Sequence, residues 1–197
     1  MARTGRPRVF DKESAISKAM VLYWEQGFES TSLAQLKEAM GISSASFYAA
    51  FGSKENLFKE VIDRYNTSYG TVTDCLADPS LHPKEAIEKA LRQTAKMQTD
   101  PSHPSGCMLV LSANVCSEKN KHVRDVVFEE RTLVRANLEA CILRGQKNGD
   151  ITSNVNSDVL CTLIEGFMYG ISTQARDGVG HQSMDQAITQ MMKTFDM

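Results

Sequence analysis

Small hydroxyl and methyl side chains gather in one short stretch of the chain, between Ser43 and Gly52. If this stretch is a helix that buries Phe47 and Phe51, the 100° step per residue turns a different set of side chains outward. That outward set is Ser44, Ala45, Ser46, Tyr48 and Ala49. Hydroxyl groups hydrogen-bond to several DNA bases, and small methyl groups suit the methyl of thymine. The stretch therefore predicts a surface that contacts base edges, with modest selectivity because it holds no Arg, Asn or Gln for a two-bond contact.

A second group of residues is suited to phosphates, since its members lie at or near expected helix N-termini, where unpaired amides attract anions. These residues are Thr31, Ser32, Ser43 and Lys54, and Tyr48 is long enough to join them. Arg6 and Arg8 precede the first acidic residue in a short basic arm, of the kind that follows a DNA backbone or enters a minor groove. Helix pairs with serine caps occur in many proteins, so these residues alone also allow an ordinary helical hairpin.

The elements that must position these residues are helices. Apolar residues recur with a helical period throughout, and no alternating run is long enough for a strand, which predicts an all-α chain of about nine helices. Stop and cap residues predict a helix over 12–26, a second between Ser32 and Gly41, a third between Ser43 and Gly52, and a fourth from Ser53 to near Cys75. Breaks rich in Pro, Gly and polar residues then separate further helices over 83–99, 106–117, 120–147, 157–177 and 183–195.

Composition sets the class of protein. The 197 residues, 42% of them hydrophobic, are enough for a folded core. Residues 1–65 carry nine Lys or Arg against eight Asp or Glu, and residues 66–197 carry thirteen against sixteen, so the positive charge leans toward the first part. No apolar run reaches the roughly 18 to 20 residues of a membrane span, and no signal peptide is visible. We therefore expect a cytoplasmic protein with no membrane partner.

The cysteines and histidines show no spacing of a metal site or a disulfide framework. The five cysteines are Cys75, Cys107, Cys116, Cys141 and Cys161, none of them in a CxxC pair, and the histidines form no HxxxH pair. We expect reduced thiols, no metal ligand and no cofactor.

The segment from Phe10 to Phe58 resembles the DNA-binding domain of TetR-type transcriptional regulators. The matching features, in order, are Gly27-Phe28, Thr31-Ser32, Gly41-Ile42-Ser43, Phe47-Tyr48 and Phe51-Gly52-Ser53-Lys54-Glu55-Asn56-Leu57. The resemblance implies an all-α homodimer, with a three-helix helix-turn-helix domain for DNA over residues 1–65 and an effector-binding and dimerisation domain over residues 66–197. Many members carry a histidine or an aromatic residue just after the Tyr48 position, where this chain has Ala49 and Ala50, so the base preference of relatives does not carry over.

The last two predicted helices are candidates for the dimer interface. The helix over 157–177 has a wide apolar arc and two glycines spaced for close backbone approach, and it pairs with the helix over 183–195 to suggest a four-helix interface across a two-fold axis. The interface residues expected on this basis are Leu163, Gly166, Phe167, Gly170, Met191 and Phe195. The alternative is that these side chains are buried inside one subunit.

The stretch from Gly106 to Cys116 is apolar on nearly every side and predicts a central buried helix. Some TetR-type regulators that respond to electrophiles or oxidants look similar here, which makes Cys107 a candidate sensor, with Cys116 and Met108 as further effector-site candidates. Against this, a free cysteine usually behaves as a small buried hydrophobe, and no charged residue lies between Ser105 and Ser117 to favour a thiolate. On one continuous helix, Cys107 and Cys116 would stand about 13 Å apart, too far for a disulfide.

The sequence thus favours a DNA-binding regulator, by family habit a repressor, that leaves a palindromic operator when a small-molecule or thiol-reactive effector acts on its C-terminal domain. Two alternatives remain at this point. One is a helical ligand-binding protein with no operator. The other is an enzyme with a cysteine nucleophile, which we do not expect because the only nearby base, His103, is separated from Cys107 by Pro104 and Gly106.

Overall fold

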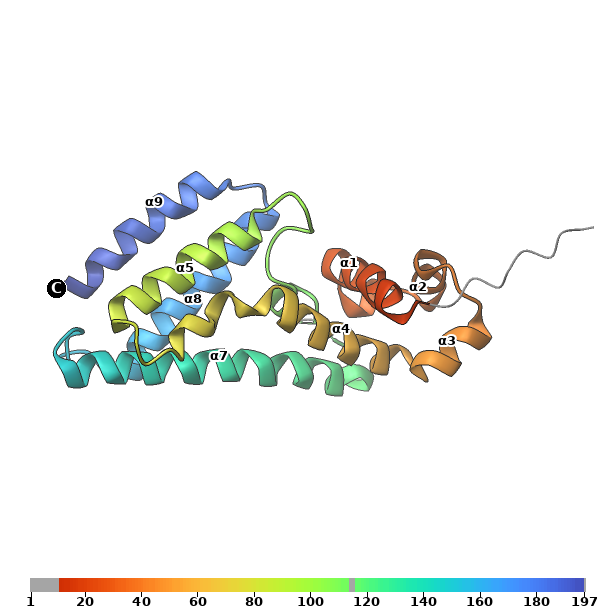
Figure 1. Cartoon of the computed structure of the whole chain (residues 1–197), viewed down its shortest axis with the longest axis horizontal. Helices are drawn as coiled ribbons and strands as arrows, with labels where there is room; N and C mark the ends of the chain where they lie inside the picture. The colour runs from red at the N-terminus through yellow and green to blue at the C-terminus, as the bar shows by residue number, and fades with distance from the viewer. Residues whose placement is uncertain (1–10, 114–115, 197) are drawn as a thin grey trace, which may run out of the picture.

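The computed structural model describes residues 11–113 and 116–196, so Arg6 and Arg8 of the expected basic arm lie outside the described residues. Within this part the chain is helical and contains no strand. The first four helices form a head at one end of an elongated molecule, and the others form a body at the opposite end (Figure 1). The all-α prediction is confirmed.

The head consists of α1 (Lys12–Ser30), α2 (Leu33–Met40), α3 (Ser44–Phe51) and α4 (Lys54–Ser68). Each start has the cap that its sequence predicts, since the side chains of Asp11, Ser32, Ser43 and Ser53 all accept a hydrogen bond from a backbone N–H of the first turn. Ser32 and Gln35 also form a capping box, in which each side chain bonds to the backbone N–H of the other residue. The predicted stop at Gly27 is a non-helical residue inside α1, with φ 77° and ψ 168°, after which the chain resumes one more turn.

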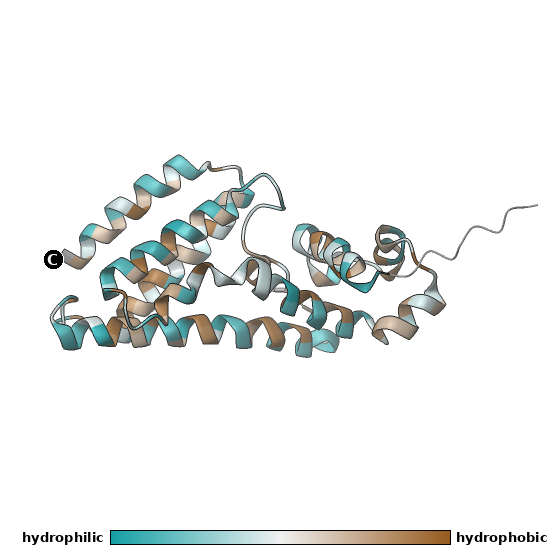
Figure 2. Ribbon diagram, in the orientation of Figure 1, coloured by the Kyte–Doolittle hydropathy of each residue, from teal (hydrophilic) through white to brown (hydrophobic). Residues whose placement is uncertain are grey.

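The body consists of η1 (Gly70–Leu76), α5 (Pro83–Gln98), α6 (Met108–Leu111), η2 (Glu118–Asn120), α7 (Lys121–Asn148), α8 (Ser157–Arg176), α9 (His181–Met192) and η3 (Lys193–Asp196). The long helix α7 runs under the body and reaches the head with its N-terminal end (Figure 1). Apolar and polar stretches alternate along α7, as expected of a helix with one buried side (Figure 2). In the described part of the chain, no helix is both long and apolar enough to cross a membrane.

Two predicted helices differ from the structure. The fourth helix ends at Ser68 and continues as the 3-10 segment η1, rather than as one helix to Cys75. Of the helix expected over 106–117, the described residues contain only the four of α6. The reason lies in tertiary contacts, because the carbonyl groups of Gly106, Leu109 and Ser112 accept hydrogen bonds from Trp24, Arg131 and Phe28.

Two apolar cores run through the molecule. The first joins the buried faces of α1 to α4 and also includes Met108, Leu109 and Ala113 around α6, together with Val123 and Val127 of α7. The second lies among η1, α5, α7, α8 and α9. Because the first core takes side chains from both ends of the molecule, the position of the head depends on α6 and on the start of α7.

Candidate DNA-reading face and effector cavity

The outward face of α3 is exposed as the helical periodicity predicts. Phe47 and Phe51 are buried in the first core and hold the helix in place. The side chains of the opposite face are exposed, and Tyr48 is 54% exposed. This reading face consists of Ser44, Ala45, Ser46, Tyr48 and Ala49. It offers small groups around one large phenol, a shape that can approach base edges closely.

A lysine that the sequence analysis missed stands beside this face. The Lys37 ammonium, from the last turn of α2, donates to the Ser44 hydroxyl at 2.7 Å. Next to them, the Ser43 hydroxyl accepts from the Ser46 amide and lies 3.0 Å from the Ser46 hydroxyl. The short turn between α2 and α3 brings the C-terminal end of α2 close to the start of α3. A lysine in the last turn of α2 could therefore have been predicted to lie beside the outward face of α3.

Two expected phosphate contacts are corrected by the structure. Thr31 is fully buried, and its hydroxyl donates to the Gly27 carbonyl at 2.7 Å, so it cannot reach a ligand. The Lys54 ammonium donates to the Phe28 carbonyl at 2.6 Å and lies 4.2 Å from the centre of the Phe28 ring. Partial burial lowers the pKa of Lys54, with Glu29 and Glu55 acting in the opposite direction. Lys54 therefore braces the end of α1 against α4 instead of pointing outward.

Ser32 stays exposed, but its hydroxyl is engaged in the capping box. Its O–H donates to Gln35 Oε1 at 2.7 Å, and its backbone N–H donates to the same atom at 2.8 Å. A DNA phosphate that binds at the start of α2 would have to displace Gln35 Oε1 from the hydroxyl or the backbone N–H of Ser32.

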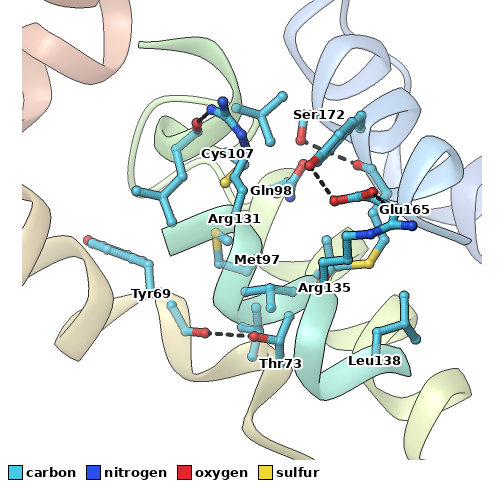
Figure 3. A pocket seen from close by; sticks show the side chains of 18 of the residues that line it. Tyr69, Thr73, Met97, Gln98, Cys107, Arg131, Arg135, Leu138, Glu165 and Ser172 are labelled. Carbon is cyan, nitrogen blue, oxygen red and sulfur yellow. Dashed lines mark hydrogen bonds and ion pairs between the residues drawn. The ribbon is translucent and has the colours of Figure 1, made fainter. Parts of the chain in front are cut away.

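The body contains a partly open cavity of about 70 Å³. It lies among α4, η1, α5, α6, α7 and α8, and its surface is mostly apolar (Figure 3). The polar part of the wall includes an ion pair, in which the Arg135 guanidinium donates to Glu165 at 2.5 Å. Asp158 on α8 also binds Arg135, and the Tyr169 hydroxyl donates to Glu165 at 2.6 Å. A concave, largely apolar space with a few polar groups in its wall is typical of a small-molecule site.

Only one of the three expected effector-site residues lines this cavity. Cys107 does so, and the Tyr65 hydroxyl donates to its sulfur at 3.3 Å. Burial raises the pKa of the Cys107 thiol, and the Tyr65 hydrogen bond opposes that rise. Met108 is instead buried in the first core, and Cys116 lies outside the cavity wall with its thiol against the Ala113 carbonyl at 3.4 Å. All five cysteines are free.

The segment 105–112, which contributes Cys107, Leu109 and Val110 to the cavity wall, is hydrogen-bonded to the head. Trp24 Nε1 donates to the Gly106 carbonyl at 2.9 Å, and the Phe28 amide donates to the Ser112 carbonyl at 2.7 Å. The Arg176 guanidinium, at the end of α8, donates to the carbonyls of Trp24, Glu25 and Ser105 at 2.8 to 3.0 Å. These bonds join α1 to the segment 105–112, whose other side borders the cavity.

A carboxylate forms a second connection between head and body. Glu29 Oε1 accepts from the Asn120 side chain and from the backbone and hydroxyl groups of Ser117, at 2.6 to 3.0 Å. These hydrogen bonds lower the pKa of Glu29 to about 2, with the Asn120 side chain contributing most. The end of α1 is thus held against the segment that begins α7.

The expected dimer residues fall into two groups. Leu163 is 63% exposed and Gly166 is exposed with open space beside it, while Phe167 and Gly170 are half-buried along the same stripe of α8. Met191 on α9 is also half-buried. Phe195 is the exception, because it is 5% exposed and buried within the second core, whereas Phe167 and Met191 are only partly buried where they pack against that core.

The histidines do not form a metal site. In the described residues, no three His, Cys, Asp or Glu side chains come together in a way that could hold a metal ion. His103 stacks on Trp24 with 4.7 Å between ring centres, and its Nδ1 faces the Pro104 carbonyl. It is therefore part of the aromatic packing around Trp24 and is not a solvated loop residue.

Family models match most of the chain in two parts. Residues 15–61 match the model described as bacterial regulatory proteins, tetR family. Residues 83–191 match the model described as the tetracyclin repressor-like C-terminal domain.

Individual relatives extend over nearly the whole length. The chain is 28% identical to the HTH-type transcriptional repressor ComR of Escherichia coli (strain K12), over 92% of this chain and 87% of ComR. It is 30% identical to the repressor BdcR of the same organism, over 88% of this chain and 83% of BdcR. Among solved structures, a cysteine mutant of the TetR family transcriptional regulator CifR, complexed with 26-base-pair operator DNA, matches with a TM-score of 0.88 and 32% identity. That match covers 97% of this chain and all of the CifR chain.

Proposed function

Because the chain belongs to the TetR family of bacterial transcriptional regulators, we propose that it is a repressor that occupies a palindromic operator as a homodimer and leaves it when an effector enters the body cavity. Residues 1–65 bind the DNA, and residues 66–197 bind the effector and form the dimer. A protein that binds bacterial operator DNA acts in the cytoplasm, which is the location that we propose. The likeness to CifR in complex with operator DNA, over nearly the full length of both chains, carries this proposal.

The reading face of α3 and the residues around it contact the DNA. The outward groups of Ser44, Ala45, Ser46, Tyr48 and Ala49 approach base edges in the major groove, while Lys37 and Ser43 lie where phosphates would flank them. Arg6 and Arg8 extend the contact as a basic arm. With no two-bond base contact in this set, DNA shape adds to the selectivity.

The test is operator binding by fluorescence anisotropy, using DNA that flanks the protein's own gene, over a series of salt concentrations. Ala49→Glu places a carboxylate on the exposed reading face and is expected to abolish binding without unfolding the protein. Ala77→Glu, on an exposed residue of the body, is the matched control and is expected to bind like the parent. Equal binding by both variants, or no preference for any flanking sequence, would contradict the DNA-reading role of α3.

The dimer interface is proposed to lie on the exposed stripe of α8 around Leu163 and Gly166, flanked by Phe167, Gly170 and Met191. Leu163→Glu is expected to yield monomers in sedimentation and to lose operator binding, because two heads must span successive major grooves about 34 Å apart. Leu133→Glu on α7 alters a leucine of similar exposure, 59% against 63%, and is expected to remain dimeric. Dimers of Leu163→Glu would place the interface elsewhere.

Release requires that the effector favour a body conformation whose heads no longer fit the operator. We propose α4 as one lever, because Tyr65 lines the cavity near one end of α4 and Lys54 holds the head at the other. The segment 105–112 is a second route, since it borders the cavity and carries the hydrogen bonds to Trp24 and Phe28.

A second kind of effector is a thiol-reactive compound that acts on Cys107. The observation in its favour is that Cys107 is the one cysteine in the cavity wall, with the Tyr65 hydroxyl on its sulfur. Cys107→Ser is expected to abolish release of DNA by such a compound, while Cys116→Ser keeps it. Release that persists in Cys107→Ser would make this thiol structural.

We propose no catalytic role for Cys107. A cysteine nucleophile needs a base within hydrogen-bond reach, whereas His103 is stacked on Trp24 and the pKa of the thiol is raised. The protein is therefore expected to bind effectors without turning them over.

A further inference from the structure

Two polar side chains of α5 face the cavity without a hydrogen-bond partner. Thr94 and Gln98 line the wall one helical turn apart, and they are 2% and 3% exposed. Neither the Thr94 hydroxyl oxygen nor Gln98 Oε1 has a partner in the described chain. Buried polar atoms are almost always paired in folded proteins, so two neighbouring unpaired atoms in one cavity wall indicate a partner that enters from the cavity.

The charged groups of the wall, in contrast, are already engaged by the protein. Arg135 binds Glu165 and Asp158, and Glu165 accepts a further hydrogen bond from Tyr169. Arg131 donates to the Leu109 carbonyl at 2.6 Å. A charged ligand would have to displace one of these partners, whereas an uncharged ligand leaves them in place.

The size of the space limits what can be enclosed. The cavity volume is about 70 Å³. This is about half of the roughly 150 Å³ of a cavity that binds benzene, so a ligand of six or seven non-hydrogen atoms requires some movement of the walls.

We propose that the cavity binds a small uncharged molecule with an apolar body and one hydroxyl group, an alcohol or a phenol. The hydroxyl donates to Gln98 Oε1 and accepts from the Thr94 hydroxyl, which satisfies both atoms at once. The apolar body lies against the remaining wall, which includes Met97 and Leu138 (Figure 3) as well as Met168. This inference names the effector class for the cavity and so rests on the proposed function.

The position of this hydroxyl site also connects it to the head. The Gln98 carbonyl accepts from the Gly106 amide at 2.9 Å, and the Gly106 carbonyl accepts from Trp24 Nε1 at 2.9 Å. A ligand bound at Gln98 is thus two hydrogen bonds away from α1.

The test compares three cyclohexane derivatives on the full chain without DNA: cyclohexanol and methylcyclohexane, which match in size, and the somewhat larger cyclohexanecarboxylate. Binding is followed by calorimetric titration and by the fluorescence of Trp24. The centre of the Trp24 ring lies 4.9 Å from that of Tyr65 and 5.0 Å from that of Tyr69, and both tyrosines line the cavity. Cyclohexanol is expected to bind at least about tenfold more tightly than methylcyclohexane, which leaves both polar atoms unpaired. It is also expected to bind more tightly than cyclohexanecarboxylate at pH 7.5.

Two variants remove the polar atoms and keep the shape. Thr94→Val and Gln98→Leu are expected to fold, because apolar groups of similar shape replace unpaired buried ones, and to lose the preference for cyclohexanol, because its hydroxyl then lacks a partner in the wall. Ser112→Ala is the matched control. The Ser112 hydroxyl is equally buried and unpaired but lies outside the cavity wall, so this variant is expected to keep the preference.

Equal affinity for cyclohexanol and methylcyclohexane in the parent would overturn the inference, as would tighter binding of the carboxylate. A preference for cyclohexanol that survives both α5 variants would also overturn it, since the hydroxyl would then bind elsewhere. None of these measurements involves DNA. Failure of the operator experiment with an intact alcohol preference would therefore refute the repressor role alone, and the reverse result would refute the ligand class alone.

Discussion

Replacing Gly27 with alanine tests how closely the head is fitted to the body. At φ 77° and ψ 168°, Gly27 adopts a backbone conformation that is essentially restricted to glycine, and a side chain there costs about 1–3 kcal/mol. A Cβ at this position would also lie 3.0 Å from the Ser112 carbonyl oxygen, which accepts the hydrogen bond from the Phe28 amide. Weakening that bond increases the loss of stability by about 0.5–1.5 kcal/mol. Alanine also restricts the unfolded chain more than glycine does, which offsets about 0.4–1 kcal/mol of the loss. We expect a net loss of about 2–3 kcal/mol.

Gly149→Ala provides the comparison. Gly149 also has a positive φ, 81°, but a Cβ there meets nothing within 4 Å. The left-handed backbone costs alanine about 1–2 kcal/mol, so after the same unfolded-state correction we expect a loss of about 1 kcal/mol or less.

Urea unfolding at one fixed protein concentration measures both losses. Trp24 is the only tryptophan, is 1% exposed and lies three residues from Gly27, so its fluorescence follows the unfolding of the head. With a slope of about 2 kcal/mol per molar urea, Gly27→Ala should shift the midpoint by about 1 M and Gly149→Ala by less than half of that. If Gly27→Ala costs no more than Gly149→Ala, the close approach of α1 to Ser112 does not contribute to stability and the reasoning fails.

Three further predictions concern single contacts. Lys37→Gln should weaken binding to all DNA sequences and lower the salt dependence of operator affinity by about two phosphate contacts, one for each head of the dimer, whereas Lys147→Gln, at the far end of α7, should change neither; equal slopes would remove Lys37 from the interface. The folded-state pKa of Glu29, about 2, lies below its ordinary value of 4.5, so its contribution to stability is complete above about pH 4.5 and is lost as the pH falls toward 2. Glu29→Gln should therefore flatten the dependence of the urea midpoint on pH between 2 and 4.5, and an unchanged slope would contradict the assignment. Arg176→Met should reduce the effect of a bound effector on operator affinity while the effector still binds, as measured by operator titrations with and without it; an unchanged effect would exclude Arg176 from the coupling.

Local sequence signals predicted the head closely. Serine and aspartate caps, the stop at Gly27 and the helical spacing of Phe47 and Phe51 act within one or two turns, and they gave the positions of α1 to α3 and the exposed face of α3. The prediction of helices over 120–147 and 157–177 rests on equally local patterns and is confirmed to within a residue or two.

What the sequence did not predict depends on partners far away along the chain. The apolar stretch after Gly106 matches a helix, yet its carbonyls bind Trp24, Phe28 and Arg131, so only α6 forms. Lys54 stands at a helix start but is drawn to the Phe28 carbonyl. The cavity itself combines residues from α4 to α8, so no single segment could indicate that Thr94 and Gln98 meet there.

The shared first core has a consequence for the exchange of parts among relatives. A chimera that joins the head of one regulator to the body of another at the end of α4 would separate Trp24, Phe28 and Tyr65 from Met108 and Val127, which pack in the same core. Such a hybrid keeps every residue of the reading face and still loses part of the support for α1. For this protein, the transplantable unit is therefore discontinuous: residues through α4 together with the segment from Gly106 to Val127. Recombination in evolution, like the design of new sensors, would have to move both pieces at once.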